Sequence, residues 1–317
     1  MSGPSACQMA RKQAQAAYLP QCEGPTEGRR VVALRWNDLP ADVLAVLRKG
    51  TVIPAHPLAL NASRQFDERR QRALTRYYVE AGSGGLAVGV HTTQFAIRDV
   101  GLYEPVLSLA MQTARETTKR PLVMIAGLAG KTAQAVKEAQ TSRGIGYHAG
   151  LLSLAAMKGA SEDEIIEHAR QVAAEIPLVG FYLQPAVGGI VLPASFWKRF
   201  AGIENVVAIK MAPFNRYRTL DVIRGVVEAR AEDRITLYTG NDDHIVLDLV
   251  TPFVVVRDGK PVTVRIKGGL LGHWSCWAQR AVELLDRAQK EAAQSSVSEE
   301  MLALDSQVTD CNAAIFD

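Results

Sequence analysis

Aromatic residues make up only 6% of the 317-residue chain, and its 36 Lys and Arg residues exceed its 33 Asp and Glu residues so slightly that the net charge is +3. So small a charge gives no reason to expect a nucleic acid or an anionic membrane as partner, because both attract strongly basic surfaces. The sequence also lacks any run of 18 apolar residues, which argues against a membrane span. The composition favours a globular protein whose partner is a small molecule.

Cysteines are also few, and the four present, Cys7, Cys22, Cys276 and Cys311, form no CxxC pair. This spacing matches neither a zinc site nor the disulfide framework of a small secreted protein, so we expect reduced thiols and no metal site. The first residues lack an apolar core followed by a small-residue cleavage site, so they do not indicate a signal peptide. We therefore expect a cytoplasmic protein that needs no cofactor.

From residue 50 onward, short runs rich in Val, Ile and Leu alternate with segments of helical period. Eight runs predict strands, at 51–58, 85–92, 122–128, 149–155, 178–184, 206–212, 235–240 and 266–272. Several are apolar throughout, as expected of parallel strands that helices cover. Eight strand–helix units predict an α/β fold, a (β/α)8 TIM barrel.

Parts of the chain fall outside this alternation of predicted strands and helices. We expect an N-terminal extension over 1–48, with a mobile start and a helix across the floor of the barrel. The barrel is predicted over 49–280, with a β-hairpin inserted at 253–266. A C-terminal helical segment is predicted over 281–317.

Lys210 is the first candidate for catalysis, because catalytic groups of such barrels lie at the carboxyl ends of the strands. It follows the apolar run VVAI, so its ammonium group would lose hydration on either face of the strand. Desolvation lowers the pKa of an amine and frees its lone pair to attack a carbonyl, which gives a Schiff base. The alternative is a lysine that reaches solvent or pairs with Asp242 or Asp243.

Tyr182 precedes Lys210 by 28 residues, about one strand–helix unit. The phenol and the amine are therefore predicted to meet at the barrel mouth, where the tyrosine can shuttle a proton. Alternatively, Tyr182 fills the barrel and its hydroxyl bonds a backbone group.

His91, Thr92 and Thr93 end the second predicted strand. Adjacent hydroxyls and the amides of a turn make an anion site suited to a carboxylate, although Thr-Thr pairs are common in strands.

Together, these features resemble the dihydrodipicolinate synthase and N-acetylneuraminate lyase family, class I aldolases on a (β/α)8 barrel that bind pyruvate or another 2-oxo acid as a Schiff base. The resemblance covers about residues 50–290, and its specific part is the spacing from tyrosine to lysine. The matching motifs are the turn at His91, Thr92 and Thr93, the Tyr-x-x-Pro strand end at Tyr182 and Pro185 with Gly189 beyond it, the lysine strand at Ile209 and Lys210, the turn at Gly240, Asn241 and Asp242, and the pair Gly268 and Gly269.

The resemblance implies roles for these residues. Lys210 would form the imine, Tyr182 would act as its acid and base, and Thr92 and Thr93 would hold the carboxylate of the 2-oxo acid. It also implies a homodimer or homotetramer.

Three departures from the family pattern affect the expected function. Val187 stands where the synthases carry the arginine that binds the second substrate's carboxylate, so a true dihydrodipicolinate synthase is not expected. No tyrosine follows the fourth strand to complete a proton relay, so His91, His56 or a water would have to move protons. His56 also replaces the threonine common at the end of the first strand.

The sequence thus predicts a lyase or aldolase that forms a Schiff base with pyruvate or another 2-oxo acid. The second substrate, an unidentified aldehyde or sugar acid, would meet Val187 with an apolar, hydroxylated or aromatic part. The substrate-binding residues expected are His56, His91, Thr92, Thr93, Val187 and Gly189. Two alternatives remain. One is a hydratase-aldolase or sugar-acid dehydratase on the same barrel, and the other is a catalytically silent barrel that acts as a 2-oxo acid binding protein or a regulatory protein.

Overall fold

The structure is a computed structural model that describes residues 33–316. The expected mobile start lies outside the described residues.

Eight parallel strands form one sheet in the order β1, β10, β7, β6, β5, β4, β3, β2. A parallel bridge between Ala55 and Ala87 joins the two outermost strands, and the His56 amide donates to the Ala87 carbonyl at 2.8 Å. The sheet therefore closes on itself, which confirms the predicted (β/α)8 barrel. The strands are β1 (Val52–Pro54), β2 (Gly85–Val88), β3 (Val123–Leu128), β4 (Ala149–Leu152), β5 (Leu178–Leu183), β6 (Val206–Ala212), β7 (Thr236–Thr239) and β10 (Ile266–Leu271).

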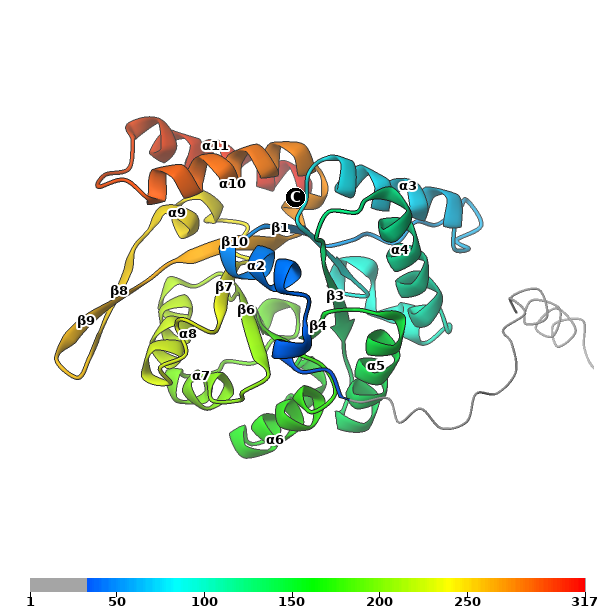
Figure 1. Ribbon diagram of the computed structural model, residues 1–317, viewed down its shortest axis with the longest axis horizontal. Coiled ribbons are helices and arrows are strands. Elements are labelled where there is room, and N and C mark those ends of the chain that lie inside the picture. Colours follow the sequence, from blue (N-terminus) through cyan, green and yellow to red (C-terminus); the bar gives the residue numbers. More distant parts are fainter. Residues whose placement is uncertain (1–32, 317) are drawn as a thin grey trace, which may run out of the picture. The chain divides into compact units, whose positions relative to one another are not determined.

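Helices surround this ring of strands (Figure 1). Their starts follow from local chemistry: Asp67 and Asn215 accept amide hydrogen bonds at the first turns of α3 and α8, and Ser161 forms a capping box with Glu164 on α6. The α-helices are α2 (Ala41–Lys49), α3 (Glu68–Glu80), α4 (Tyr103–Thr117), α5 (Thr132–Ile145), α6 (Glu162–Ala173), α7 (Ala194–Ala201), α8 (Arg216–Glu228), α9 (Ile245–Val250), α10 (Ala278–Ala292) and α11 (Glu299–Phe316). Short 3-10 helices are η1 (Trp36–Asp38), η2 (His91–Thr93), η3 (Phe95–Arg98), η4 (Ala155–Met157), η5 (Pro185–Val187) and η6 (His273–Ser275).

The buried side chains form two clusters because successive strand residues point to opposite faces. One cluster fills the barrel and includes Val179 and Phe181 of β5 with Ala208 and Ala212 of β6. The other lies between the strands and the helices. Helix α2 closes the amino-terminal end of the barrel, where Val43 and Leu47 join the inner cluster. The barrel is thus a packed core, and its open mouth is at the carboxyl ends of the strands.

Two additions accompany the barrel. Strands β8 (Phe253–Arg257) and β9 (Lys260–Val264) pair as an antiparallel hairpin, with Asp258 and Gly259 both at positive φ in the turn. Helices α10 and α11 both pack against α9, and the hairpin extends away from the strands (Figure 1). No helix within residues 33–316 is long and apolar enough to cross a membrane.

Candidate active site

The Lys210 side chain lies inside the barrel. Its neighbours along β6 in the inner cluster are Ala208 and Ala212, whereas Ile209 and Met211 face the helices. The ammonium nitrogen is 4.5 Å from the centroid of the Phe181 ring on the adjacent strand β5. On the other side, Lys210 passes over Gly240, where a Cβ atom would come within 2.5 Å of the lysine Cε. Gly240 therefore leaves the space that the lysine occupies.

This environment changes the acidity of the Lys210 amine. Desolvation by the surrounding protein lowers its pKa from 10.5 to about 8, although the negative charge of Asp242 acts in the opposite direction. Roughly one amine in ten is then unprotonated at pH 7, against fewer than about one in a thousand for an ordinary lysine. Part of the side chain stays accessible at the barrel mouth. The group is thus suited to attack a carbonyl.

Asp242 is the acidic group that acts on Lys210. It lies in the turn after β7, only partly exposed, and its Oδ1 atom is buried with no hydrogen-bond partner among the described residues. Desolvation raises the pKa of its carboxyl group to about 6, while Lys210 and the backbone amide of His273 lower it. A carboxyl group with this pKa can both accept and return a proton near neutral pH.

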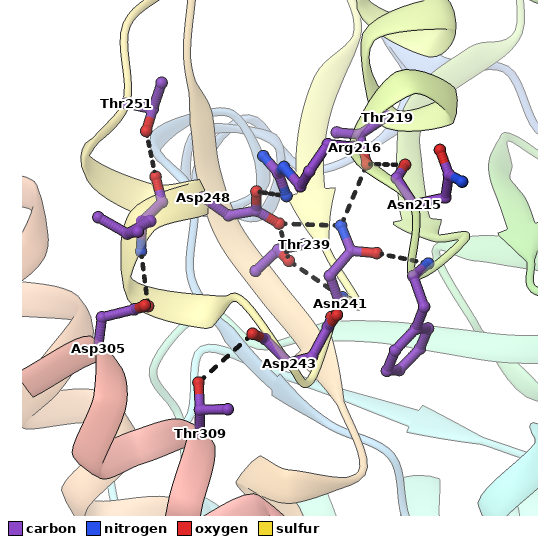
Figure 2. Close-up of polar contacts among 12 residues, drawn as sticks. Asn215, Arg216, Thr219, Thr239, Asn241, Asp243, Asp248, Thr251, Asp305 and Thr309 are labelled. Carbon is purple, nitrogen blue, oxygen red and sulfur yellow. Dashed lines mark hydrogen bonds and ion pairs between the residues drawn. The ribbon is translucent and has the colours of Figure 1, made fainter.

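A buried carboxylate, Asp248 on α9, contacts side chains from β7, from the turn after it and from the start of α8 (Figure 2). Its Oδ2 atom accepts hydrogen bonds from the Thr239 hydroxyl at 2.6 Å and the Asn241 amide at 3.0 Å. Its Oδ1 atom forms an ion pair with Arg216 at 2.6 Å. Asn241 in turn accepts a hydrogen bond from the backbone amide of Phe214 at 3.1 Å. The ends of β6 and β7 are therefore fixed to one carboxylate.

Tyr182 does not meet Lys210, which corrects the predicted apposition of the phenol and the amine. Its ring packs on Trp197 of α7 with 5.1 Å between centroids. Its hydroxyl accepts a hydrogen bond from the Leu192 amide at 3.2 Å and donates one to the Leu192 carbonyl at 3.3 Å. The physical reason is the alternation along β5, because Phe181 takes the inward position and Tyr182 the outward one.

The threonine turn lies on η2, where the two hydroxyl groups have different surroundings. The Thr93 hydroxyl is buried, donates to the His56 carbonyl at 2.6 Å and accepts a hydrogen bond from the Gly89 amide at 2.9 Å. His91 and Thr92 are exposed. Thr93 thus links the ends of β1 and β2, and Thr92 offers the accessible hydroxyl.

His56 points away from the barrel interior, which corrects its expected position in the pocket. It is buried against α3, with Nε2 at 2.8 Å from the Thr75 hydroxyl and Nδ1 at 3.0 Å from the Gln71 side-chain amide. Desolvation lowers the pKa of the imidazole to about 4, so the ring is neutral near pH 7. The neighbouring residue Ala55 takes the inward position. His56 therefore joins β1 to α3.

Val187 and Gly189 follow β5 in and beyond η5. The Val187 side chain is 45% exposed. Gly189 packs so closely that a Cβ atom would collide with the Leu183 carbonyl. The glycine fixes the path of this loop, and Val187 presents an uncharged side chain to solvent.

No group of three or more His, Cys, Asp or Glu side chains within residues 33–316 is arranged to hold a metal ion. Cys276 and Cys311 are free thiols at exposed positions. Cys7 and Cys22 lie outside the described residues.

Two residues at the mouth were not predicted as site residues: Phe181, the neighbour of the lysine, and Asp242, the acidic group that acts on it. The signal for Phe181 was its place beside Tyr182, since only one of two successive strand residues can face inward. The signal for Asp242 was its place two residues after Gly240, at the carboxyl end of β7.

The comparisons with known proteins agree with this architecture. A 4-hydroxy-tetrahydrodipicolinate synthase from Persephonella marina is 24% identical over 177 residues, which cover 54% of this chain and 59% of that relative. This chain thus matches well under two thirds of that relative's length.

Solved structures match over more of the chain. A dihydrodipicolinate synthase from Acinetobacter baumannii, complexed with pyruvate, has a TM-score of 0.67 and 17% identity and covers 84% of this chain and 83% of its own. An N-acetylneuraminate lyase from Fusobacterium nucleatum has a TM-score of 0.65 and 15% identity over 83% of this chain and 82% of its own. At these identities the likeness shows the fold.

The family model described as the dihydrodipicolinate synthetase family matches residues 49–251, which include every strand from β1 to β7 together with Lys210 and Asp242. The match extends over more than half of the chain, and we conclude that this protein belongs to that family.

Proposed function

We propose that the protein is a lyase of the aldolase type that forms a Schiff base between Lys210 and pyruvate or another 2-oxo acid. The observation that carries this proposal is the amine of Lys210 inside the barrel, against Phe181 and Gly240, with its pKa lowered by desolvation. Family membership and the pyruvate complex of a structural relative support the same chemistry.

In this proposal the neutral amine adds to the ketone carbon of the 2-oxo acid. The resulting carbinolamine loses its hydroxyl group as water and becomes an imine, which requires one proton to be supplied. Asp242 supplies and recovers that proton, because its raised pKa and its place beside Lys210 suit it to the transfer. The exposed Thr92 hydroxyl at the end of β2 binds the substrate carboxylate.

The second substrate differs from that of a dihydrodipicolinate synthase. The exposed, uncharged Val187 offers no partner for a second carboxylate. An aldehyde with an apolar, hydroxylated or aromatic body therefore suits this side of the mouth, and a hydratase-aldolase or sugar-acid dehydratase would use the same imine.

Borohydride reduction in the presence of pyruvate tests the proposal. Reduction should add one pyruvate-derived group to the chain, and peptide mapping should place it on Lys210. Lys210→Ala should abolish the adduct, whereas the matched variant Lys137→Ala, at an exposed position of α5, should retain it. An adduct that survives Lys210→Ala, or no adduct in the wild-type protein, would contradict the proposal.

A catalytically silent barrel is the second candidate, and two observations favour it. The Tyr182 hydroxyl bonds Leu192, and the Thr93 hydroxyl bonds the backbone. If 2-oxo acids bind reversibly, yet no imine can be trapped and no aldehyde is turned over, the silent barrel is correct.

A further inference from the structure

The C-terminal helix α11 contacts both of the segments that surround Asp242, although it lies beyond residues 49–251, the part of the chain that the family model matches. One of these segments is the turn after β7, which contains Asp242 itself. The other is η6, because the backbone amide of His273 donates a hydrogen bond to the Asp242 carboxyl group. A helix near the end of the chain can therefore influence a carboxyl group at the barrel mouth.

Asn312 of α11 holds η6 through the imidazole ring of His273. The Asn312 Oδ1 atom lies 3.2 Å from His273 Nδ1. An amide oxygen can only accept a hydrogen bond, so Nδ1 carries the proton of the neutral ring. The ring is buried, and burial lowers the pKa of His273, so the ring carries no charge near pH 7. The contact thus joins α11 to the residue whose backbone amide binds the Asp242 carboxyl group.

Thr309 and Asp305 of α11 hold the turn after β7 and the helix that follows it (Figure 2). The Thr309 hydroxyl donates to the Asp243 carbonyl within the turn, at 3.4 Å. The Asp305 Oδ1 atom accepts a hydrogen bond from the Leu247 amide of α9 at 3.2 Å. Together with Asn312, these residues connect α11 to the chain on both sides of the barrel mouth where Asp242 lies.

The three polar contacts come from one face of α11. Positions 305, 309 and 312 have the spacing i, i+4 and i+7, which places their side chains along the same side of a helix. An apolar row lies beside them, in which Met301 is fully buried and Leu304 and Val308 pack against the cluster between strands and helices. The apolar row fixes the position of α11, and its polar face then meets the segments around Asp242.

We propose that α11 completes the active site, with Asn312 and Thr309 as positioning residues that hold Asp242 beside Lys210. Their side chains act through the His273 amide and the turn after β7, and not on the substrate. This role rests on the proposed function, in which Asp242 supplies and recovers the proton of imine formation.

Loss of the Asn312 contact should change the acidity of Asp242 in one direction. Without it, η6 is held less firmly, and the hydrogen bond from the His273 amide to the carboxylate weakens. That hydrogen bond favours the charged carboxylate, so its loss raises the pKa of Asp242 above about 6. The other charges that act on this carboxyl group, Lys210 on β6 and Asp243 in the same turn, remain.

The test compares Asn312→Ala with Asp310→Ala, a control at an exposed position of the same helix. Alanine has a higher helix propensity than either replaced residue, so both variants should keep α11 folded, which urea denaturation checks. In Asn312→Ala the pKa of Asp242 should rise by about 0.5–1 pKa unit. The pH at which pyruvate trapping begins to fall on the acid side should rise equally, because the Asp242 pKa sets it. Asp310→Ala should match the wild type in both measurements.

Carbon-13 NMR of aspartate-labelled protein measures the pKa of Asp242 without any substrate. The signal is assigned by its absence in Asp242→Asn. Thr309→Val should raise the pKa in the same direction but by less, because the hydrogen bond that it removes is long and exposed.

A double-mutant cycle shows whether Asn312 acts through His273. His273→Phe keeps an aromatic ring but lacks the Nδ1 donor, so it should raise the pKa of Asp242 as Asn312→Ala does. The double variant should show no further rise, because both substitutions remove the same contact.

Three results would overturn the proposal: an unchanged Asp242 pKa in Asn312→Ala, an equal rise in Asp310→Ala, or additive rises in the cycle. Each of them with normal pyruvate trapping would refute the role of α11 and leave the proposed function intact. A wild-type protein that traps no pyruvate, yet shows the expected NMR shifts, would refute the proposed function and leave the control of Asp242 by α11 established.

Discussion

The ammonium nitrogen of Lys210 lies 4.5 Å from the centroid of the Phe181 ring, inside the barrel. A cation over an aromatic face is stabilised by about 0.5–2 kcal/mol, which favours the protonated lysine, whereas desolvation favours the neutral one. Desolvation dominates, because the pKa of Lys210 is lowered to about 8. We therefore expect Phe181 to oppose the fall of the pKa, as the negative charge of Asp242 does.

Phe181→Leu should therefore lower the pKa of Lys210 further. Leucine keeps the site apolar but removes the aromatic face, so the protonated amine loses about 0.5–2 kcal/mol of stabilisation, equivalent to a shift of about 0.4–1.5 pKa units. The pH dependence of acylation of Lys210 by a small anhydride, followed by peptide mapping, measures the shift. A pKa that stays at its wild-type value would show that the ring does not stabilise the ammonium group.

The roles proposed for Lys210 and Asp242 predict a particular pH profile for imine trapping. The reactive form has a neutral amine and a protonated carboxyl group, and its population is nearly constant between the two pKa values, about 6 and about 8. The trapping rate should be flat across this window and fall on both sides. Asp242→Asn should remove the fall at high pH and reduce the plateau by about 10²- to 10⁴-fold.

The matched control for that variant is Asp243→Asn, because Asp243 is exposed and adjacent in the chain. Its profile should keep both limbs and most of the rate. A wild-type profile in Asp242→Asn would show that another group moves the proton.

Tyr182→Phe separates a structural tyrosine from a catalytic one. The hydroxyl bonds Leu192 on the helix side of β5, so its removal should leave the trapping rate within about twofold and cost about 1 kcal/mol of the free energy of unfolding. Urea denaturation and single-turnover trapping measure the two effects. A fall in the rate of about 100-fold with unchanged stability would restore the role of proton shuttle to Tyr182.

His56 should make the fold sensitive to acid. Its pKa is about 4 in the folded protein against 6.5 for an unburied histidine, so the folded state binds fewer protons than the unfolded state between these values. The contribution of His56 to the free energy of unfolding is then fully present above about pH 6.5 and is lost as the pH falls towards 4. The share due to His56 is about 2 kcal/mol between pH 7 and pH 5.

His56→Asn should be less stable than the wild type at pH 7, because the contacts with Thr75 and Gln71 are disturbed, but should lose about 2 kcal/mol less on acidification. Urea denaturation at pH 7 and pH 5 gives the comparison. Equal acid sensitivity in both proteins would contradict the assignment and direct attention to His148, whose pKa is lowered to a similar value.

Asp248→Asn should loosen the end of β7 and the loop after β6. The substitution removes the negative charge that pairs with Arg216. It also replaces one carboxylate oxygen by an NH2 group, which cannot accept the hydrogen bonds that Thr239 and Asn241 donate to Oδ2. We expect a loss of about 3 kcal/mol in the free energy of unfolding. Asp221→Asn, which breaks an exposed pair with Arg224, should change stability by less than about 0.5 kcal/mol. Similar losses in both variants would show that the buried network has no special role.

The barrel was predictable because its signal is repeated. Each strand is a short apolar run that helices cover on the outside, and eight such runs alternate with helical segments, so an error in one boundary leaves the fold unchanged. Lys210 was predictable for a related reason, since a lysine within VVAIKMA must lose hydration on either face of the strand.

The orientation of Tyr182 was not predictable from its spacing. Twenty-eight residues fix which strand carries the tyrosine, but not which face it takes, and β5 is apolar on both faces, so no alternation of polar residues marks the inside. The register decides it: Phe181 lies beside Lys210, and Tyr182 lies beside Met211, which faces the helices. His56 was misplaced in the same way, because its partners Gln71 and Thr75 come from α3 and the sequence alone does not show that contact.

A crystal structure of the protein soaked with pyruvate would test the central claim most directly. The account predicts continuous electron density from Nζ of Lys210 to the ketone carbon of pyruvate, with the Asp242 carboxyl group facing the new bond and the Tyr182 hydroxyl still bonded to Leu192. Pyruvate bound without a covalent link, or linked to another residue, would contradict it.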